Sequence, residues 1–128
     1  MSKTIILSND APKPVGPYNQ AVRTGNLVFC AGQIALDPAT GKFSAFDITG
    51  QTNQIMKNIA AVLSEAGCKM EDIVKATVFL KDMNDFTRMN EAYSAYFNNE
   101  TAPARSTVQV ARLPLDALVE IEVVAQTT

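Results

Sequence analysis

Apolar and polar positions follow two different periods along the chain, and the period distinguishes helices from strands. The first segment with helical spacing runs from about 48 to 66. Its apolar face consists of Ile48, Ile55, Ile59, Val62, Leu63 and Ala66. Asp47 stands where an N-cap residue is favoured, and Gly67 stands where glycine commonly follows a helix. The pattern therefore predicts one long helix with a single buried face.

A second, shorter segment with helical spacing runs from about 85 to 97, after Asn84 or Asp82 as a possible cap. Its apolar stripe consists of Phe86, Met89, Tyr93 and Phe97. Asn90 follows Met89 directly, so we expect it at the edge of the buried face.

Six further segments are rich in β-branched and aromatic residues, which is typical of strands. They cover about 3–7, 20–24, 27–31, 73–80, 106–110 and 118–125. Gly25-Asn26 predicts a tight turn, and Gly32-Gln33 with the stretch 37–41 predicts a surface loop. The resulting order is βββαβαββ. Two helices against one mixed six-stranded sheet form an α+β architecture.

Length and composition fit one domain covering residues 1–128. Hydrophobic residues make up 47% and charged residues 19%, so the chain can bury a core without a metal or disulfide. The 11 Lys and Arg residues are scattered and the net charge is −2, which argues against a nucleic-acid partner. The apolar run Ile5-Ile6-Leu7 is too short for a signal segment or a membrane span, so we expect a cytoplasmic protein.

The chain contains no histidine and only two cysteines, Cys30 and Cys68. Nucleophile pairs of serine or cysteine with histidine are therefore excluded, as is a zinc site with histidine ligands. Two distant cysteines do not make a thiolate metal site, and Cys30 lies in an apolar strand where a core role is expected. Acid–base chemistry must use Asp, Glu, Lys, Tyr, Cys or a bound water.

Polar residues alternate with valines and isoleucines in the last two predicted strands. Arg105, Thr107 and Gln109 share one side of the first strand, and Glu120 and Glu122 share one side of the second. If these strands pair as a hairpin with their apolar sides under the helices, all five polar residues share the opposite face of the sheet.

Such a cluster has two interpretations. Arg105 could bind a carboxylate through two parallel hydrogen bonds while a glutamate orients water, which suits a substrate whose carboxylate adjoins an electrophilic carbon. Alternatively, the residues form a solvated face with surface ion pairs. The spacing alone leaves both interpretations open.

Several blocks of the sequence resemble the Rid (reactive intermediate deaminase) family. These blocks are Gly16-Pro17-Tyr18, Gly32-Gln33-Ile34, VKATVFLKD at 74–82, PARSTVQVARLP at 103–114, and Val119-Glu120-Ile121-Glu122. They occur in the family's order and spacing, and the resemblance covers essentially the whole chain.

The resemblance implies a chorismate-mutase-like fold that assembles as a homotrimer with its sites in clefts between subunits. It implies hydrolysis of enamines and imines such as 2-iminobutanoate and 2-iminopropanoate to 2-keto acids and ammonia. The expected ligands are small 2-imino and 2-keto acids, and no cofactor or metal is expected.

By the same resemblance, Arg105 matches the arginine that holds the substrate carboxylate, and Glu120 matches the glutamate that handles the hydrolytic water. The matching pocket positions are Tyr18, Gly32, Asn90 and Thr107. Two departures stand out. Ala31 occupies a position where the family often has serine, and Thr107 one where some members carry cysteine, which weighs against a thiol role there.

Two alternatives remain open at the level of sequence. One is a non-catalytic module that binds keto acids or other small carboxylates through Arg105. The other is an endoribonuclease or translation inhibitor, an activity also attributed to the family. The acidic charge balance and the absence of histidine count against the second alternative. Neither the preferred imine side chain nor the upstream enzyme follows from the sequence.

Overall fold

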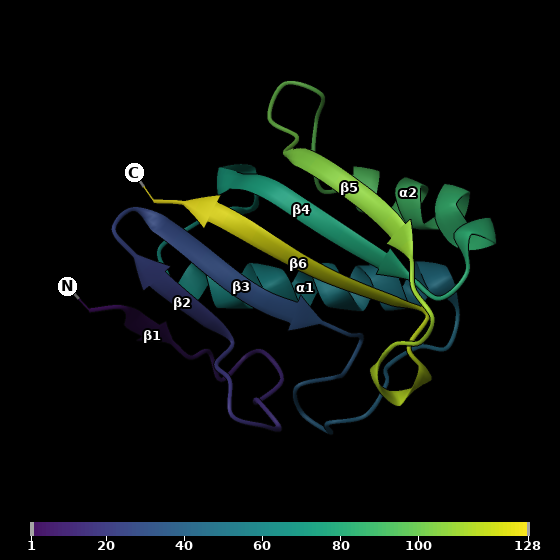
Figure 1. Ribbon diagram of the computed structural model, residues 1–128, viewed down its shortest axis with the longest axis horizontal. Helices are drawn as coiled ribbons and strands as arrows, with labels where there is room; N and C mark the ends of the chain where they lie inside the picture. Colours follow the sequence, from purple (N-terminus) through teal and green to yellow (C-terminus); the bar gives the residue numbers. More distant parts are fainter. Residues whose placement is uncertain (1, 128) are drawn as a thin grey trace.

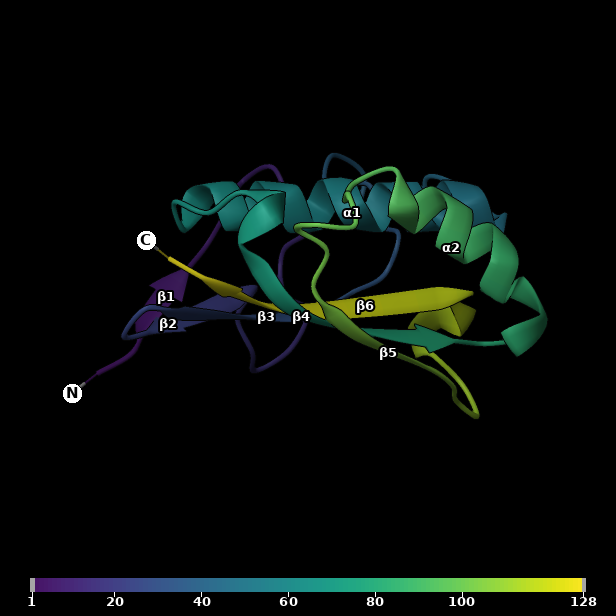
Figure 2. The same ribbon diagram turned by 90° about the horizontal axis from the view of Figure 1, so that it is seen from above.

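Two helices cover one face of a six-stranded sheet in the computed structural model, which describes residues 2–127 (Figures 1 and 2). The strands are β1 (Thr4–Ile6), β2 (Ala21–Thr24), β3 (Leu27–Gln33), β4 (Ile73–Leu80), β5 (Ala104–Gln109) and β6 (Val119–Gln126). The helices are α1 (Ile48–Glu65) and α2 (Phe86–Ser94). The predicted α+β class and element order are confirmed; the end residues 1 and 128 of the expected domain lie outside the described residues.

The strands follow the order β1-β2-β3-β6-β4-β5 across the sheet (Figure 1). All neighbours are antiparallel except β4 and β5, so the sheet is mixed. The predicted hairpin of β5 and β6 is wrong, because β4 lies between them. Val119, Ile121 and Ala125 of β6 are fully buried, so this strand takes the centre of the sheet. The more polar β5 takes an edge.

Helix α1 packs its predicted apolar stripe against the sheet. Ile55, Ile59 and Leu63 are completely buried. The Asp47 carboxylate accepts a hydrogen bond from the Gly50 N–H at 3.4 Å and caps the helix as expected. Gly67 follows the helix with φ +79°, a conformation that glycine adopts without strain. No helix within residues 2–127 is long and apolar enough to cross a bilayer.

Strand β3 continues through the segment where a loop was predicted, by means of a β-bulge. Cys30 pairs with Val123 and Gln33 pairs with Ile121, so two residues of β3 oppose one residue of β6. The extra residue keeps Cys30 and Gln33 on the buried face, although three positions separate them. The prediction missed this because a glycine after a strand is usually a turn.

A buried glutamine fixes the segment that precedes β2. The Gln20 carboxamide accepts a hydrogen bond from the Ser8 N–H at 2.6 Å. Its nitrogen donates to the carbonyls of Ser8 at 3.0 Å, Pro12 at 2.9 Å and Ala11 at 3.3 Å. Gln20 is only 2% exposed, so one side chain holds residues 8–12 against the sheet.

Replacing Gln20 by leucine should destabilise the fold, because the buried backbone groups of Ser8 and Pro12 lose their partner. We expect Gln20→Leu to lower the free energy of unfolding by at least about 2 kcal/mol. Urea unfolding at fixed protein concentration measures this. The control is Gln126→Leu at an exposed position of β6; an equal loss in both variants would contradict the role of Gln20.

Candidate active site

The predicted site residues lie on opposite faces of the sheet. Arg105 stands opposite Ala76 and Thr107 opposite Val78, and both β4 residues are fully buried under the helices. Glu120 stands opposite Phe79 and therefore lies on the face without helices. The expectation that the arginine and the glutamate share a face is wrong.

The alternation correctly grouped residues within each strand but assigned β5 to the wrong face. Its apolar Val108 is 43% exposed on the open face, and its polar Arg105, Thr107 and Gln109 point towards α2. An edge strand is only partly covered by the helical layer, so its polar side can be accommodated there. Gln109, for example, accepts a hydrogen bond from the Met83 N–H at 2.7 Å.

Aromatic rings of α2 hold the guanidinium of Arg105. Its central carbon lies 4.7 Å from the ring centroid of Tyr93 and 5.7 Å from that of Phe86. Cation–π contacts of this kind restrict the orientation of a guanidinium without using its N–H donors. Within residues 2–127, Arg105 forms no ion pair with an acidic side chain. Its planar fork is therefore available for a carboxylate from outside the chain.

Asn90 and Thr107 belong to the same region, and with Arg105 they form what we call the arginine group. Asn90 follows Phe86 by four positions and precedes Tyr93 by three, so all three residues share one side of α2. The hydroxyl groups of Thr107 and Tyr93 are buried without a hydrogen-bond partner in the described part of the chain. An unpaired buried hydroxyl is unfavourable, which suits a place where a further polar group binds.

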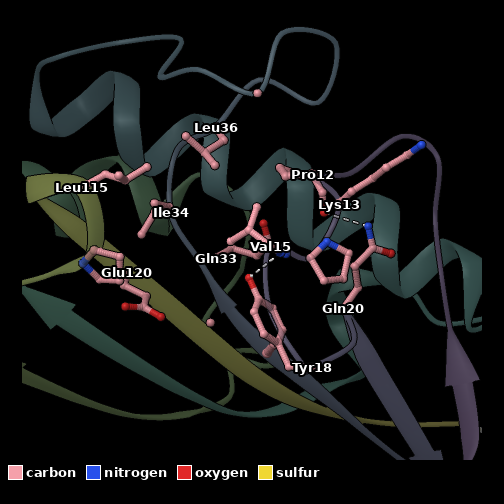
Figure 3. Close-up of a pocket in the computed structure, with 15 residues that line it drawn as sticks. Pro12, Lys13, Val15, Tyr18, Gln20, Gln33, Ile34, Leu36, Leu115 and Glu120 are labelled. Atoms are coloured by element: carbon pink, nitrogen blue, oxygen red, sulfur yellow. Dashed lines mark hydrogen bonds between the residues drawn. The ribbon is translucent and has the colours of Figure 1, made fainter.

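A cavity of about 650 Å³ lies at the other predicted group of residues, and we call it the glutamate pocket (Figure 3). Glu120 and Tyr18 both line it. The other lining residues are Pro12, Lys13, Pro14, Val15, Gln20, Ala31, Gly32, Gln33, Ile34, Leu36, Gly41, Pro114 and Leu115.

The bulge in β3 shapes this pocket. A methyl group at Gly32 would overlap the carboxylate of Glu120, so only glycine leaves room for that side chain as it stands. Opposite, the Tyr18 hydroxyl accepts a hydrogen bond from the Val15 N–H at 3.4 Å (Figure 3). Gln20 holds residues 8–12 against the sheet, so the wall of the pocket that begins at Pro12 is held in place.

The environment of Glu120 favours its protonated form. Partial burial raises the pKa of its carboxyl group, and the neighbouring Glu122 carboxylate raises it further. Glu122 lies two positions along β6 on the same open face. A carboxyl group whose pKa is shifted towards neutrality is suited to exchange a proton with water or substrate.

A single chain cannot bring both groups to one small molecule. Strand β4 separates β5 from β6, which amounts to roughly 10 Å between strand axes. The side chains of Arg105 and Glu120 also leave the sheet in opposite directions. Any reaction that needs both must combine residues from two copies of the chain.

The structure gives less support to metal binding or to a cysteine nucleophile. Within residues 2–127, no cluster of three or more His, Cys, Asp or Glu side chains could hold a metal ion. Cys30 is buried as predicted, and burial raises the pKa of its thiol to about 12, so it is not a nucleophile at neutral pH.

Some site residues were missed by the sequence analysis. Phe86 and Tyr93 were assigned to the core stripe of α2, yet they also support Arg105. Ile34, Leu36 and Leu115 were not assigned to any site, and all three line the glutamate pocket. Only the three-dimensional arrangement shows these roles.

Comparison with known proteins identifies the family of the chain. The family model described as Endoribonuclease L-PSP matches residues 8–127. The solved structure of YyfA from Yersinia pestis, described as a protein of unknown function of the conserved Rid protein family, superposes with a TM-score of 0.95. It is 44% identical, and the match covers 98% of this chain and 100% of YyfA. The chain belongs to the Rid family.

Two further members of the Rid family carry information about ligands. The Escherichia coli (strain K12) protein named 2-iminobutanoate/2-iminopropanoate deaminase is 50% identical over 127 residues, which are 98% of each chain. The structure of E. coli TdcF with bound serine has a TM-score of 0.91 and is 43% identical. That match covers 98% of this chain and 99% of TdcF. The family assignment made from the sequence blocks is thus confirmed.

The raised pKa of Glu120 predicts a stability effect that depends on pH. A raised pKa means that the folded state binds this proton more strongly than the unfolded state, so stability falls as pH rises through and above the ordinary range of glutamate. Glu120→Gln should therefore be more stable than wild type at about pH 7 and should lose this advantage below about pH 3.5. Urea unfolding at both pH values measures it.

Two further variants separate this effect from a general loss of negative charge. Glu91→Gln removes an exposed carboxylate of α2 and should leave stability nearly unchanged at both pH values. Glu122→Gln should lower the pKa of Glu120 in a carboxyl NMR titration, because it removes the repulsion. An ordinary pKa for Glu120 in wild type would refute the account.

Proposed function

We propose that this member of the Rid family hydrolyses short 2-imino acids, including 2-iminobutanoate and 2-iminopropanoate, to 2-keto acids and ammonia without metal or cofactor. The observation that carries the proposal is the guanidinium of Arg105, which lies on the ring of Tyr93 and has no acidic partner within residues 2–127. An arginine that an aromatic ring holds in place, and that has no acidic partner, can bind a carboxylate through its planar fork.

The relatives support the same chemistry. The E. coli relative is named for 2-iminobutanoate and 2-iminopropanoate, which are small carboxylates with an imine next to the carboxylate. The TdcF structure holds serine, which carries a carboxylate and a nitrogen on the same carbon. Ligands with this arrangement suit one arginine and one carboxylic acid placed on either side of them.

Arg105 binds the substrate carboxylate through its two parallel N–H groups. This contact fixes the orientation of the adjacent imine carbon, which is the electrophile. Asn90 and the unpaired Thr107 hydroxyl lie on the same side and supply further polar contacts. The aromatic rings restrict the guanidinium in advance, so less freedom is lost on binding.

Glu120 handles the water. The enamine first tautomerises to the imine, whose protonated form accepts attack by water at carbon. Glu120 takes a proton from the attacking water and gives it to the nitrogen of the resulting carbinolamine. The hydroxyl group of the carbinolamine then loses its proton to Glu120 as the carbon–nitrogen bond breaks, which forms the 2-keto acid and releases ammonia; the ammonia or solvent water takes this proton from Glu120. Its raised pKa suits both transfers. Tyr18 and Gly32 shape the space around its carboxylate.

The complete site forms between copies of the chain, in a homotrimer. One copy supplies the arginine group and a neighbour supplies the glutamate pocket, because one chain presents them on opposite faces. The face of the sheet that no helix covers (Figure 2) also carries large exposed apolar side chains. Ile5 is 46%, Phe29 45% and Val108 43% exposed, which favours burial against another copy.

Substitution of Arg105 tests the carboxylate contact. Arg105→Ala removes the contact that binds and orients the substrate and should abolish imine hydrolysis, with a loss of affinity of roughly tenfold to a hundredfold. Arg105→Lys keeps the charge but loses the planar fork, so it should be badly impaired too. The assay couples a threonine dehydratase to the protein and follows semicarbazone formation, which traps imine that escapes hydrolysis.

Arg23→Ala provides the control, because Arg23 is an exposed arginine of β2. It should divert imine to free keto acid as wild type does. If Arg105→Ala stays folded and is fully active, Arg105 is a structural residue. If wild type binds keto acids but leaves the imine lifetime unchanged, the binding-module alternative replaces the proposal.

Mixing two inactive variants tests whether the site is shared. Arg105→Ala and Glu120→Gln should each be inactive alone. When they are co-refolded in equal amounts, about a quarter of the sites combine an intact arginine with an intact glutamate from different copies. Activity should therefore return to about a quarter of wild type.

The mixed sample must be compared with each variant refolded separately, and light scattering should give three times the mass of one chain. A site contained in one chain would show no recovery in the mixture. Recovery in a sample whose mass corresponds to a single chain would also contradict the model.

A further inference from the structure

Two consecutive left-handed residues, neither of them glycine, lie in the turn that leads into β6. Leu115 has φ 55° and ψ 25°, and Asp116 has φ 57°. Aspartate tolerates this region comparatively well, whereas leucine rarely adopts it. Leu115 is therefore the unusual residue of the turn.

Backbone hydrogen bonds show which turn it is. The Asp116 N–H donates to the Leu113 carbonyl at 3.1 Å, and the Ala117 N–H donates to the Pro114 carbonyl at 3.1 Å. The first of these closes a turn with proline at its second position and positive φ at its third. That third position normally holds glycine or asparagine, and here it holds Leu115.

Folding of the chain does not explain this leucine. Leu115 is 68% exposed, whereas its neighbours Leu113 and Ala117 are 7% and 0% exposed and anchor the turn. A large exposed side chain on a strained backbone contributes little to the core. Strain of this kind is a reason to look for a function of the side chain.

An ion pair holds the turn from outside. Arg112 donates from Nε to Asp116 Oδ1 at 2.8 Å and from Nη2 to Oδ2 at 3.2 Å. Both side chains are exposed, so the ion pair removes little surface from water. It does connect the residue after Leu115 to the chain before Pro114, which restricts the turn at both ends.

The turn places Leu115 at the glutamate pocket. Figure 3 shows it at the edge of the cavity, on the same side as Ile34 and Glu120. Pro114, Ile34 and Leu36 line the same pocket, so this wall is apolar although it adjoins a carboxyl group.

We propose that Leu115 is a specificity-determining residue that selects 2-imino acids with apolar side chains. This inference rests on the proposed function. The imine carbon is planar and carries three groups: the carboxylate, the nitrogen and the side chain. With the carboxylate on Arg105 and the reacting carbon at Glu120, the side chain lies against Leu115 and its apolar neighbours.

The test compares imines made by an amino-acid oxidase from leucine and from alanine. Leu115→Ala should lower kcat/KM for the leucine-derived imine about tenfold and change the alanine-derived value by no more than about twofold. Arg112→Gln should also lower the ratio of kcat/KM for the leucine-derived imine to kcat/KM for the alanine-derived imine, by a smaller factor. Its effect should vanish in the Leu115→Ala background, because the ion pair acts through Leu115.

Leu7→Ala is the matched control, since Leu7 is 55% exposed and does not line the pocket; its ratio should equal that of wild type. Equal losses for both imines in Leu115→Ala would overturn the inference. So would an unchanged ratio accompanied by a smaller assembly mass in light scattering, which would make Leu115 a contact between copies.

Calorimetric binding of the two corresponding keto acids separates the two proposals. Suppose that wild type hydrolyses neither imine, binds the leucine-derived keto acid more tightly than the alanine-derived one, and loses this preference in Leu115→Ala. The proposed reaction then fails and the role of Leu115 stands. If hydrolysis proceeds and neither the rate ratio nor the binding preference depends on Leu115, the role of Leu115 is refuted and the reaction stands.

Discussion

The insertion of β6 between β3 and β4 is the constraint on which the rest of the structure depends. It buries the apolar side of β6 against the helices, and it turns Glu120 and Glu122 to the open face. The same insertion leaves β5 as a parallel edge strand whose polar side meets α2. One topological choice thus places the arginine and the glutamate on opposite faces of the sheet.

Local features then adjust each half of the site. The bulge in β3 allows Cys30 and Gln33 to lie on the same buried face. It also places Gly32, which has no side chain, next to the carboxylate of Glu120. On the other face, the spacing of Phe86 and Tyr93 on α2 supplies two rings for one guanidinium. In both arrangements, backbone geometry and packing hold the side chain in place.

Much of the fold could be predicted from periodicity. The spacing of Ile55, Ile59 and Leu63 is helical, and β4 was predicted with its observed ends because this largely apolar run lies between the charged residues Asp72 and Lys81. Strand pairing could not be predicted in this way. Alternation shows that Arg105 and Thr107 share a side, but the face on which that side lies depends on the neighbouring strand. The bulge and the left-handed Leu115 also depend on contacts that are remote in sequence.

Three unfavourable features of the structure lie at the site. Glu120 is kept in surroundings that oppose its charge, the Thr107 hydroxyl is buried without a partner within residues 2–127, and Leu115 occupies a strained turn. Elsewhere the chain largely follows its local preferences, with capped α1, a filled core and a fully bonded Gln20. The buried hydroxyl of Thr52 in α1, which has no partner within residues 2–127, is an exception. A scaffold that is locally consistent can tolerate such costs where binding or chemistry compensates them. Their concentration around one pocket and one arginine is therefore an argument for function that does not depend on resemblance to any relative.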